Sequence, residues 1–276
     1  MTAICLWASK PDQIFVLADS RLSAQQGVLT DNMPKIFGIP VRVYIQHRES
    51  GDLNLLWERD IAIAFTGSAT VAFSVIATIQ TCLTNLVVES PGEQPVMENV
   101  ADFAFKVFDE NYRSAAALWN ANADCSLLIA GALSETAECI EVFELQGSAS
   151  SGQPVTEVKP LDLSDGEPVL RGSGAKRLAE MLEEAKREPY ATNADILQRL
   201  IDVGHRDVGG SRQVAVVMPA DVLLPVILYP KIEVEDRFDA RLFGRSLKTH
   251  GSVGAARIGR LAIFGFPQLG LVRVRK

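Results

Sequence analysis

The sequence predicts an α+β fold with two stacked antiparallel sheets and helices on their outer faces. Three observations support this prediction: short apolar runs typical of strands, longer amphipathic segments typical of helices, and the order strands, two helices, strands, two helices, strands. Because single strands and helices do not alternate regularly, a parallel α/β sheet is not expected. With 276 residues, 47% of them hydrophobic and 22% charged, the chain can form one large domain.

The first predicted elements form a hairpin. Residues 3–8 (AICLWA) and 13–18 (QIFVLA) are apolar runs separated by SKPD, in which Pro and Asp favour a turn. A further strand is expected at 34–39, and residues 40–60 resemble an insertion before the strand IAIAFTG. From 69 to 88, apolar residues recur every three or four positions, which predicts a helix with a wide buried face.

The second half of the chain continues with groups of helices and strands. A second helix fits 97–119, where aromatic residues alternate with charges. The strands CSLLIAG and ECIEVFEL follow, and then a Gly-, Ser- and Pro-rich loop at 147–154. Helices are expected at 174–187 and 192–204, and they precede two more strands, RQVAVVM and LPVILY.

The charge distribution divides the chain into an acidic body and a basic tail. Residues 231–276 contain 10 Lys and Arg against 4 Asp and Glu, and residues 1–230 contain 17 against 30. We therefore assign one domain to 1–230 and a basic C-terminal extension to 231–276. A basic segment can bind nucleic acid, but on an acidic body it is equally suited to packing on its own domain or on a neighbouring subunit. Nucleic acid is not expected as a partner.

Several classes of protein are not favoured by the sequence. No run reaches the roughly 18 uninterrupted apolar residues of a membrane span, and the first residues lack the pattern of a signal peptide. A cytoplasmic protein without membrane contact is therefore expected. The four cysteines and three histidines are scattered, with no group at metal-ligand spacing. Neither a disulfide framework nor a metal or other cofactor is predicted.

Polar residues and glycines recur at the ends of the predicted strands. Asp19, in ADSR, stands 16 residues before Lys35 in MPKIF. Gly67 in FTGSA and Ser173 in RGSGA lie at strand-to-helix junctions, and Asp207 lies in RDVGGSRQVAVV. Each of these has a structural interpretation when taken singly. Asp19 fits a turn cap and Lys35 a solvated surface lysine, whereas Gly67 fits a turn and Ser173 a helix N-cap.

In this order, and behind a threonine that directly follows Met1, the motifs resemble those of the proteasome-like N-terminal-nucleophile hydrolases. That family includes proteasome β subunits and the peptidase subunit of the bacterial two-component ATP-dependent protease. The resemblance covers roughly residues 2–220 and implies a four-layer αββα sandwich. It implies these site residues: Thr2 as nucleophile, Asp19 as the carboxylate that pairs with the catalytic lysine, Lys35 as that lysine, Gly67 as oxyanion donor, Ser173 beside the terminal amine, and Asp207 as a second carboxylate.

The chemistry of these residue types agrees with the resemblance. A threonine hydroxyl needs a base near neutral pH, and a free α-amino group, with an ordinary pKa of about 7.7–8.0, can serve without any histidine. Removal of Met1 would supply that amine at Thr2. As a cation, Lys35 would favour the neutral amine and the developing alkoxide, and Asp19 would keep the lysine charged and oriented. The backbone N–H of Gly67 would stabilise the oxyanion.

The resemblance also implies a mainly apolar pocket for the substrate. Such a pocket would prefer an apolar or small residue on the acyl side of the scissile bond. Its expected lining residues are Leu22, Ser23, Met33, Phe37, Phe65 and Ala69.

These inferences predict a threonine hydrolase that cleaves peptide or amide bonds through an acyl-enzyme and forms a ring-like homo-oligomer. One alternative is an amidase or acylase that uses the same nucleophile on small molecules, and its preference for small amides over unfolded protein would distinguish it. The other is a catalytically silent scaffold that keeps the fold for assembly. A scaffold that retained Met1 would have no free amine on Thr2. The sequence identifies neither the substrate nor an ATPase partner.

Overall fold

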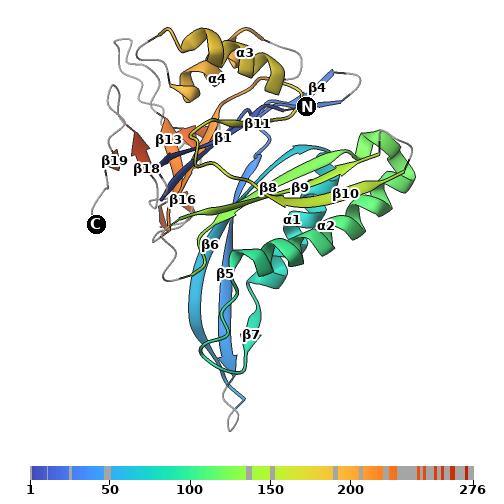
Figure 1. The fold of residues 1–276 in the computed structure, drawn as a ribbon, viewed down its shortest axis with the longest axis vertical. Coiled ribbons are helices and arrows are strands. Elements are labelled where there is room, and N and C mark those ends of the chain that lie inside the picture. The colour runs from blue at the N-terminus through green and yellow to red at the C-terminus, as the bar shows by residue number, and fades with distance from the viewer. Residues whose placement is uncertain are drawn as a thin grey trace.

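The computed structural model describes residues 2–10, 12–24, 27–46, 51–134, 139–149, 153–188, 192–204 and 208–219, and further along the chain the backbone of strands β13 to β19. Two large sheets and four α-helices make up this described part (Figure 1). The expected α+β class is thereby confirmed. None of the helices in the described ranges is long and apolar enough to cross a membrane.

The first large sheet has the strand order β10-β9-β8-β6-β5-β7. Neighbouring strands are antiparallel except for β5 and β7, which run parallel. The register of β5 against β6 runs from Ile36 opposite Ala64 to Gln46 opposite Leu53, so residues 40–46 and 53–60 of the insertion-like stretch belong to these two long strands. The bounds are β5 (Ile36–Gln46), β6 (Leu53–Gly67), β7 (Leu86–Val88), β8 (Cys125–Gly131), β9 (Glu141–Ser148) and β10 (Val155–Pro160).

The second large sheet contains the predicted N-terminal hairpin. Its order is β11-β1-β2-β12-β13-β14-β15, and β18 pairs in parallel with β13, so strands of the basic tail join this sheet. Two further hairpins, β3 with β4 and β16 with β17, stand apart. The bounds are β1 (Ile4–Lys10), β2 (Gln13–Ala18), β3 (Leu22–Ala24), β4 (Gly27–Thr30), β11 (Val169–Arg171), β12 (Gln213–Val217), β13 (Leu224–Leu228), β14 (Arg241–Leu242), β15 (Arg245–Ser246), β16 (Ser252–Val253), β17 (Ala256–Arg257), β18 (Ala262–Phe264) and β19 (Leu271–Val272).

Helices cover one face of each large sheet (Figure 1). Helix α1 begins where the Ser68 side chain accepts a hydrogen bond from the Val71 N–H, and α4 begins with a capping box between Thr192 and Asp195. The bounds are α1 (Ala69–Leu83), α2 (Met97–Trp119), the 3₁₀ helix η1 (Asn120–Ala123), α3 (Ala175–Ala185) and α4 (Asn193–Asp202).

The predicted helix at 69–88 is too long, because the structure ends α1 at Leu83. The Asn85 side chain donates to the Thr81 carbonyl and thereby satisfies one of the last free carbonyls of the helix. Residues 86–88 instead form β7, parallel to Val43–Ile45 of β5. The period of three or four fitted Leu86 and Val87 to the helix, but the β-branched side chains of Val87 and Val88 favour a strand once a neighbouring strand is available.

Other differences concern short strands and one boundary. The strands β3, β4, β10 and β11 were not predicted, and β9 ends three residues beyond the predicted ECIEVFEL segment. Three of these strands have only three or four residues, and a run that short carries little periodicity.

Three apolar clusters form the core. One lies between the two sheets and joins Ile4 and Val16 of the second sheet to Ala62 and Leu128 of the first. A second packs α1 and α2 on the outer face of the first sheet, and a third packs α3 and α4 on the outer face of the second. Full burial of a Val, Leu or Ile side chain contributes about 1.5–3 kcal/mol, so the clusters hold both sheets and their helices together.

Antiparallel pairing gathers the candidate residues at one end of the two sheets. In the second sheet, Ile4 lies opposite both Ala18 and Arg171, so the start of β1 meets the ends of β2 and β11. In the first sheet, Ile36 lies opposite Ala64, so the start of β5 meets the end of β6. Residues far apart in the sequence therefore reach a common site.

Candidate active site

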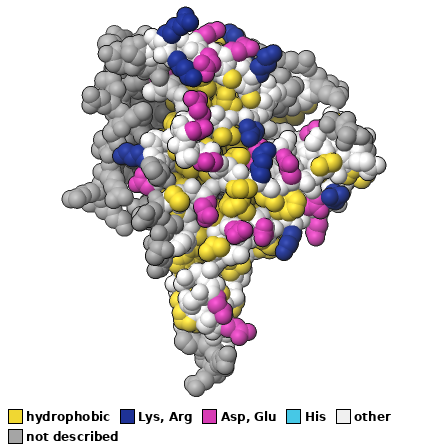
Figure 2. Space-filling model, viewed as in Figure 1, with side chains coloured by type: hydrophobic (Ala, Val, Ile, Leu, Met, Phe, Trp, Pro, Cys, Tyr) yellow, Lys and Arg dark blue, Asp and Glu magenta, His cyan; other side chains and the backbone are white. Residues whose placement is uncertain are grey.

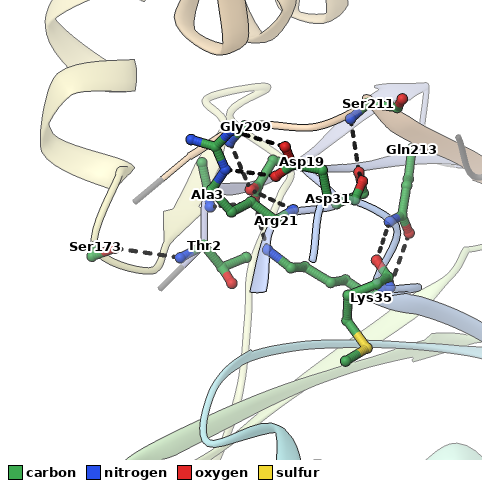
Figure 3. A network of polar contacts seen from close by, with 12 residues as sticks. Thr2, Ala3, Asp19, Arg21, Asp31, Lys35, Ser173, Gly209, Ser211 and Gln213 are labelled. Carbon is green, nitrogen blue, oxygen red and sulfur yellow. Dashed lines mark hydrogen bonds and ion pairs between the residues drawn. The ribbon is translucent and has the colours of Figure 1, made fainter. Parts of the chain in front are cut away.

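Asp19 is the centre of the polar network in Figure 3. It follows β2, is fully buried, and accepts four hydrogen bonds. Its Oδ1 accepts from the Ala3 N–H at 2.9 Å and from the Lys35 Nζ at 2.8 Å, and its Oδ2 accepts from the N–H groups of Arg21 and Gly209, both at 3.1 Å. The bond from Arg21 is the turn that sequence alone suggested, but the other three bonds join distant segments.

Lys35 is 1% exposed, which rules out the interpretation as a solvated surface lysine. Its N–H donates to the Gln213 side chain at 2.9 Å, and Gln213 in turn donates to the Met33 carbonyl at 2.6 Å. These bonds hold the turn before β5 against β12. Burial lowers the pKa of Lys35 below its usual value, and the charge and hydrogen bond of Asp19 oppose that shift. An amine with a lowered pKa releases a proton more readily than an ordinary lysine.

Thr2 lies between Ser173 and Lys35 (Figure 3) and is 2% exposed. Its backbone nitrogen, a peptide N–H in the full chain, donates to the Ser173 Oγ at 3.3 Å. Its carbonyl accepts from the Gly174 N–H at 3.1 Å. The N-cap of α3 is Gly174 and no side chain caps that helix, so Ser173 contacts Thr2 and does not serve as the N-cap. The backbone of Thr2 is thus held from both sides.

Gly172 permits this close approach. Its φ is +94°, and a Cβ at this position would overlap with the Thr2 carbonyl oxygen. We expect Gly172→Ala to lower the free energy of unfolding by about 2 kcal/mol or more, from backbone strain and overpacking together. Urea unfolding measures the effect.

Gly166→Ala is the matched control for that variant. Gly166 has a φ of +72°, but nothing lies within 4 Å of the position that its Cβ would take. Its loss should therefore reflect strain alone, about 1–2 kcal/mol. Equal losses at both glycines would contradict the close contact with Thr2.

Gly67 ends β6, and the backbone of β6 connects it to Lys35 and so to the polar network around Asp19. Its φ is +91°, and a Cβ there would overlap with the Asp124 carbonyl oxygen. That same carbonyl accepts from the Ser68 N–H at 2.8 Å. Two residues before Gly67, the Phe65 N–H donates to the Lys35 carbonyl at 3.2 Å. The turn interpretation of Gly67 therefore holds. This glycine lies opposite Cys125 of β8, and three residues before it Ala64 lies opposite Ile36, the residue after Lys35.

The residues predicted to line a pocket fall into two groups. Leu22 and Ser23 are half-buried on β3, whereas the others pack around the cluster beneath α1. Phe65 is 1% exposed, and its ring centroid lies 6.2 Å from Phe37 and 5.5 Å from Phe73. Phe65 is thus a member of the core cluster, against which the half-buried Phe37 packs. The remaining members, Met33 and Ala69, are half-buried against the same cluster.

Asp207 lies outside the described residues. The segment that follows it does reach the site, because the Gly209 N–H binds Asp19 and the Gly209 carbonyl accepts from the Ser20 N–H at 3.2 Å. The Ser211 N–H donates to the Ser20 Oγ at 2.7 Å.

Several residues of the network were missed by sequence reasoning. Arg21 pairs with Asp31 at 2.6 Å, and the hydrogen bond between them raises the pKa of the guanidinium and lowers that of the carboxyl. Arg21 was visible in the ADSR motif, but nothing in the sequence named Asp31 as its partner. Gln213 could have been found in the sequence, because it is the one polar side chain at the start of the otherwise apolar strand QVAVV.

Groups of side chains that could hold a metal ion are absent from the described residues. Burial raises the pKa of the Cys5 and Cys125 thiols to about 12, which makes both poor metal ligands and poor nucleophiles.

Comparison with known proteins relates the chain to others by structure and not by sequence. No protein-family model matches it, and no curated protein matches it in sequence. The Anbu complex from Pseudomonas aeruginosa, solved as a helical assembly, is 14% identical with a TM-score of 0.54, covering 82% of this chain and 84% of that chain. Anbu (ancestral beta-subunit) from Yersinia bercovieri is 16% identical with a TM-score of 0.49, covering 78% and 81%.

Eukaryotic HslV from Trypanosoma brucei is 18% identical with a TM-score of 0.43, covering 78% of this chain and 99% of that chain. Of these three structures, the Pseudomonas Anbu complex exceeds a TM-score of 0.5. At such low identity, the likeness shows the fold and not an activity. The chain therefore has a proteasome-like α+β fold.

Proposed function

We propose that this chain is an N-terminal threonine hydrolase that cleaves peptide or amide bonds once Met1 has been removed. The observation that carries the proposal is the shared carboxylate of Asp19, whose Oδ1 binds both the Ala3 N–H, next to Thr2, and the Lys35 Nζ. One buried group thereby fixes both the candidate nucleophile and the candidate lysine. The packing order of helices, sheet, sheet and helices supports the further proposal of a four-layer αββα sandwich.

The proposed reaction needs a hydroxyl, a base and a donor for the oxyanion. The Thr2 Oγ attacks the substrate carbonyl carbon while the α-amine of Thr2 accepts the hydroxyl proton. The tetrahedral intermediate collapses when the C–N bond breaks, and the leaving amine takes that proton. An ester then joins the acyl group to Thr2. Water hydrolyses this ester, its proton passes through the α-amine, and the Thr2 hydroxyl is restored.

Each neighbouring group has a role in this scheme. Lys35 favours the neutral α-amine through its charge, and Asp19, by its charge and hydrogen bond, opposes the lowering of the Lys35 pKa that burial causes. The Ser173 Oγ, 3.3 Å from the Thr2 nitrogen, orients the amine. The Gly67 N–H is proposed as the oxyanion donor, and loss of one such donor typically costs about 3 kcal/mol of transition-state stabilisation. A role for Asp207 remains part of the proposal.

Two measurements on the purified chain test this function. Intact mass determines whether Met1 has been removed, because Thr2 has a free amine only in the processed chain. An electrophile that bonds to both the amine and the hydroxyl of an N-terminal threonine should then add once to the processed chain and not at all to Thr2→Ala. A processed chain that remains unmodified would overturn the proposal, and a retained Met1 would favour the silent scaffold.

We also propose that the chain assembles with copies of itself. Exposed apolar side chains support this: Leu53 and Leu55 on β6 and Val87 on β7 are each at least half exposed, at 53%, 51% and 51%. Leu55 of β6 and Val87 of β7 lie on either side of Tyr44 of β5 in the register, so they share one face of the first sheet. Figure 2 shows hydrophobic side chains interspersed with charged ones on the face it displays. Light scattering that gave the monomer mass of 30.0 kDa at micromolar concentration would contradict assembly.

A further inference from the structure

Glu144 is a buried carboxylate outside the network around Asp19. It lies on β9, faces the space between the two sheets, and is 1% exposed. Arg171 binds it through two hydrogen bonds, Nε to Oε1 at 2.5 Å and Nη2 to Oε2 at 2.7 Å. The Ser126 Oγ donates to Oε1 at 3.0 Å, and the Lys159 Nζ lies 3.4 Å from Oε2. Such a two-pronged contact fixes direction as well as distance.

The two main partners of Glu144 belong to opposite halves of the candidate site. Arg171 ends β11 and lies opposite Ile4, and the next three residues, 172–174, contact Thr2. Ser126 belongs to β8, directly after Asp124 and Cys125, against which Gly67 packs. Glu144 thus connects the segment that holds the nucleophile to the segment that holds the proposed oxyanion donor, and it does so across the two sheets.

We propose that Glu144 and Arg171 are positioning residues that set the placement of Thr2 relative to Gly67. This inference rests on the proposed function, because it assigns Thr2 and Gly67 the roles given above. Neither side chain takes part in the bond-breaking steps. Their contribution is geometric: a displacement of about 1 Å between reacting groups can lower a rate about 100-fold.

The electrostatics of the pair support this role. Burial would raise the pKa of Glu144, but the hydrogen bonds and charge of Arg171, with Ser126 and Lys159, bring it below its usual value, so the carboxylate stays ionised. The pKa of Arg171 is correspondingly raised, chiefly by its hydrogen bonds to Glu144. An ionised pair with two parallel bonds holds one orientation. A lysine at position 171 would keep the charge and lose that geometry.

Arg171→Lys is the decisive variant, and Lys159→Met is its control. Lys159 contacts the same carboxylate, but it lies on β10 at the edge of the first sheet, and its register partner is Glu144 of β9. In the processed chain, we expect Arg171→Lys to lower kcat on a peptide amide by on the order of 10- to 100-fold with KM nearly unchanged. Lys159→Met should stay within about 2-fold of wild type on the same scale.

Hydrogen exchange supplies a readout that does not depend on activity. The Gly174 N–H donates to the Thr2 carbonyl, so its exchange rate reports whether the segment after Arg171 still holds Thr2. We expect this amide to exchange on the order of 10-fold faster in Arg171→Lys, with the amides of β6 and β8 unchanged. If the Glu144–Arg171 pair acted only on overall stability, Arg171→Lys would speed exchange of the Gly174, β6 and β8 amides alike and would leave kcat per folded chain unaltered.

The outcomes separate this inference from the proposed function. If wild type is inactive and resists the electrophile, the proposed function fails, and Gly174 exchange still decides whether the pair positions Thr2. If wild type is active but Arg171→Lys matches it in both kcat and Gly174 exchange, the positioning role is overturned. If Glu144→Gln folds, it should reproduce the fall in kcat, because an amide cannot accept both bonds of the guanidinium.

Discussion

Replacing Thr2 by alanine in the chain that has lost Met1 should lower hydrolysis by on the order of 10⁴-fold or more, because no other group can take the place of the nucleophile. The contacts that hold this residue use its backbone nitrogen and carbonyl, which alanine retains. The free energy of unfolding and the assembly state should therefore remain close to wild type. Turnover per chain at saturating substrate is the quantity to measure.

Thr2→Ser is the control for this variant. It keeps the amine and the hydroxyl and loses one methyl group, so part of the activity should survive. Equal turnover by wild type and Thr2→Ala, with Met1 removed from both, would show that the hydrolysis comes from another site or from a contaminant.

Replacing Asp19 by alanine should give the largest loss of stability, about 3–5 kcal/mol. The change leaves the buried Lys35 ammonium and the N–H groups of Ala3, Arg21 and Gly209 without their acceptor. Lys35→Met should be milder, about 1–3 kcal/mol, because the Asp19 carboxylate keeps its three backbone donors. Urea unfolding measures both differences.

Activity should not follow the same order as stability. Lys35→Met should be nearly as inactive as Thr2→Ala although it folds better than Asp19→Ala, because residues that act as one unit do not lose rate additively. Glu58→Gln is the matched control for Asp19→Ala. Glu58 forms an ion pair with Arg42, and the two side chains are 42% and 41% exposed. Its replacement should therefore lower the free energy of unfolding by less than about 1 kcal/mol. If Asp19→Ala were as stable as Glu58→Gln, the central role of Asp19 would be wrong.

The strand ends of the candidate site could be predicted because each is marked locally. Asp19 follows an apolar run, and Gly67 and Ser173 stand where strand patterns give way to helix patterns. Antiparallel pairing then brings such ends together without further information. Direct hydrogen bonds join four of the predicted residues in the structure: Thr2 with Ser173, and Asp19 with Lys35.

Other features had no local mark. The Glu144 carboxylate reads in sequence as an ordinary polar residue of EVFEL, and its partner lies 27 residues away. The residues of β7 were predicted as helix, because Leu86 and Val87 continue the three- and four-residue spacing of the apolar residues in α1. The family resemblance placed Phe65 in the lining of a pocket, and only the structure shows that its ring packs against Phe37 and Phe73 in the core. Its contact with substrate stays a prediction.

The sequence by itself determined the α+β class and the hairpin of β1 and β2, because periodicity and turn residues are properties of neighbouring positions. It indicated Thr2, Asp19 and Lys35 as candidates through the order of motifs that resembles a known family. Only the tertiary structure decided which groups share a hydrogen bond. Asp19 accepts from Gly209, which is 190 residues away, and Lys35 binds Gln213 at a separation of 178. Such contacts arise when two sheets bury one polar cluster between their ends, since every buried donor there must find an acceptor and composition cannot say which one.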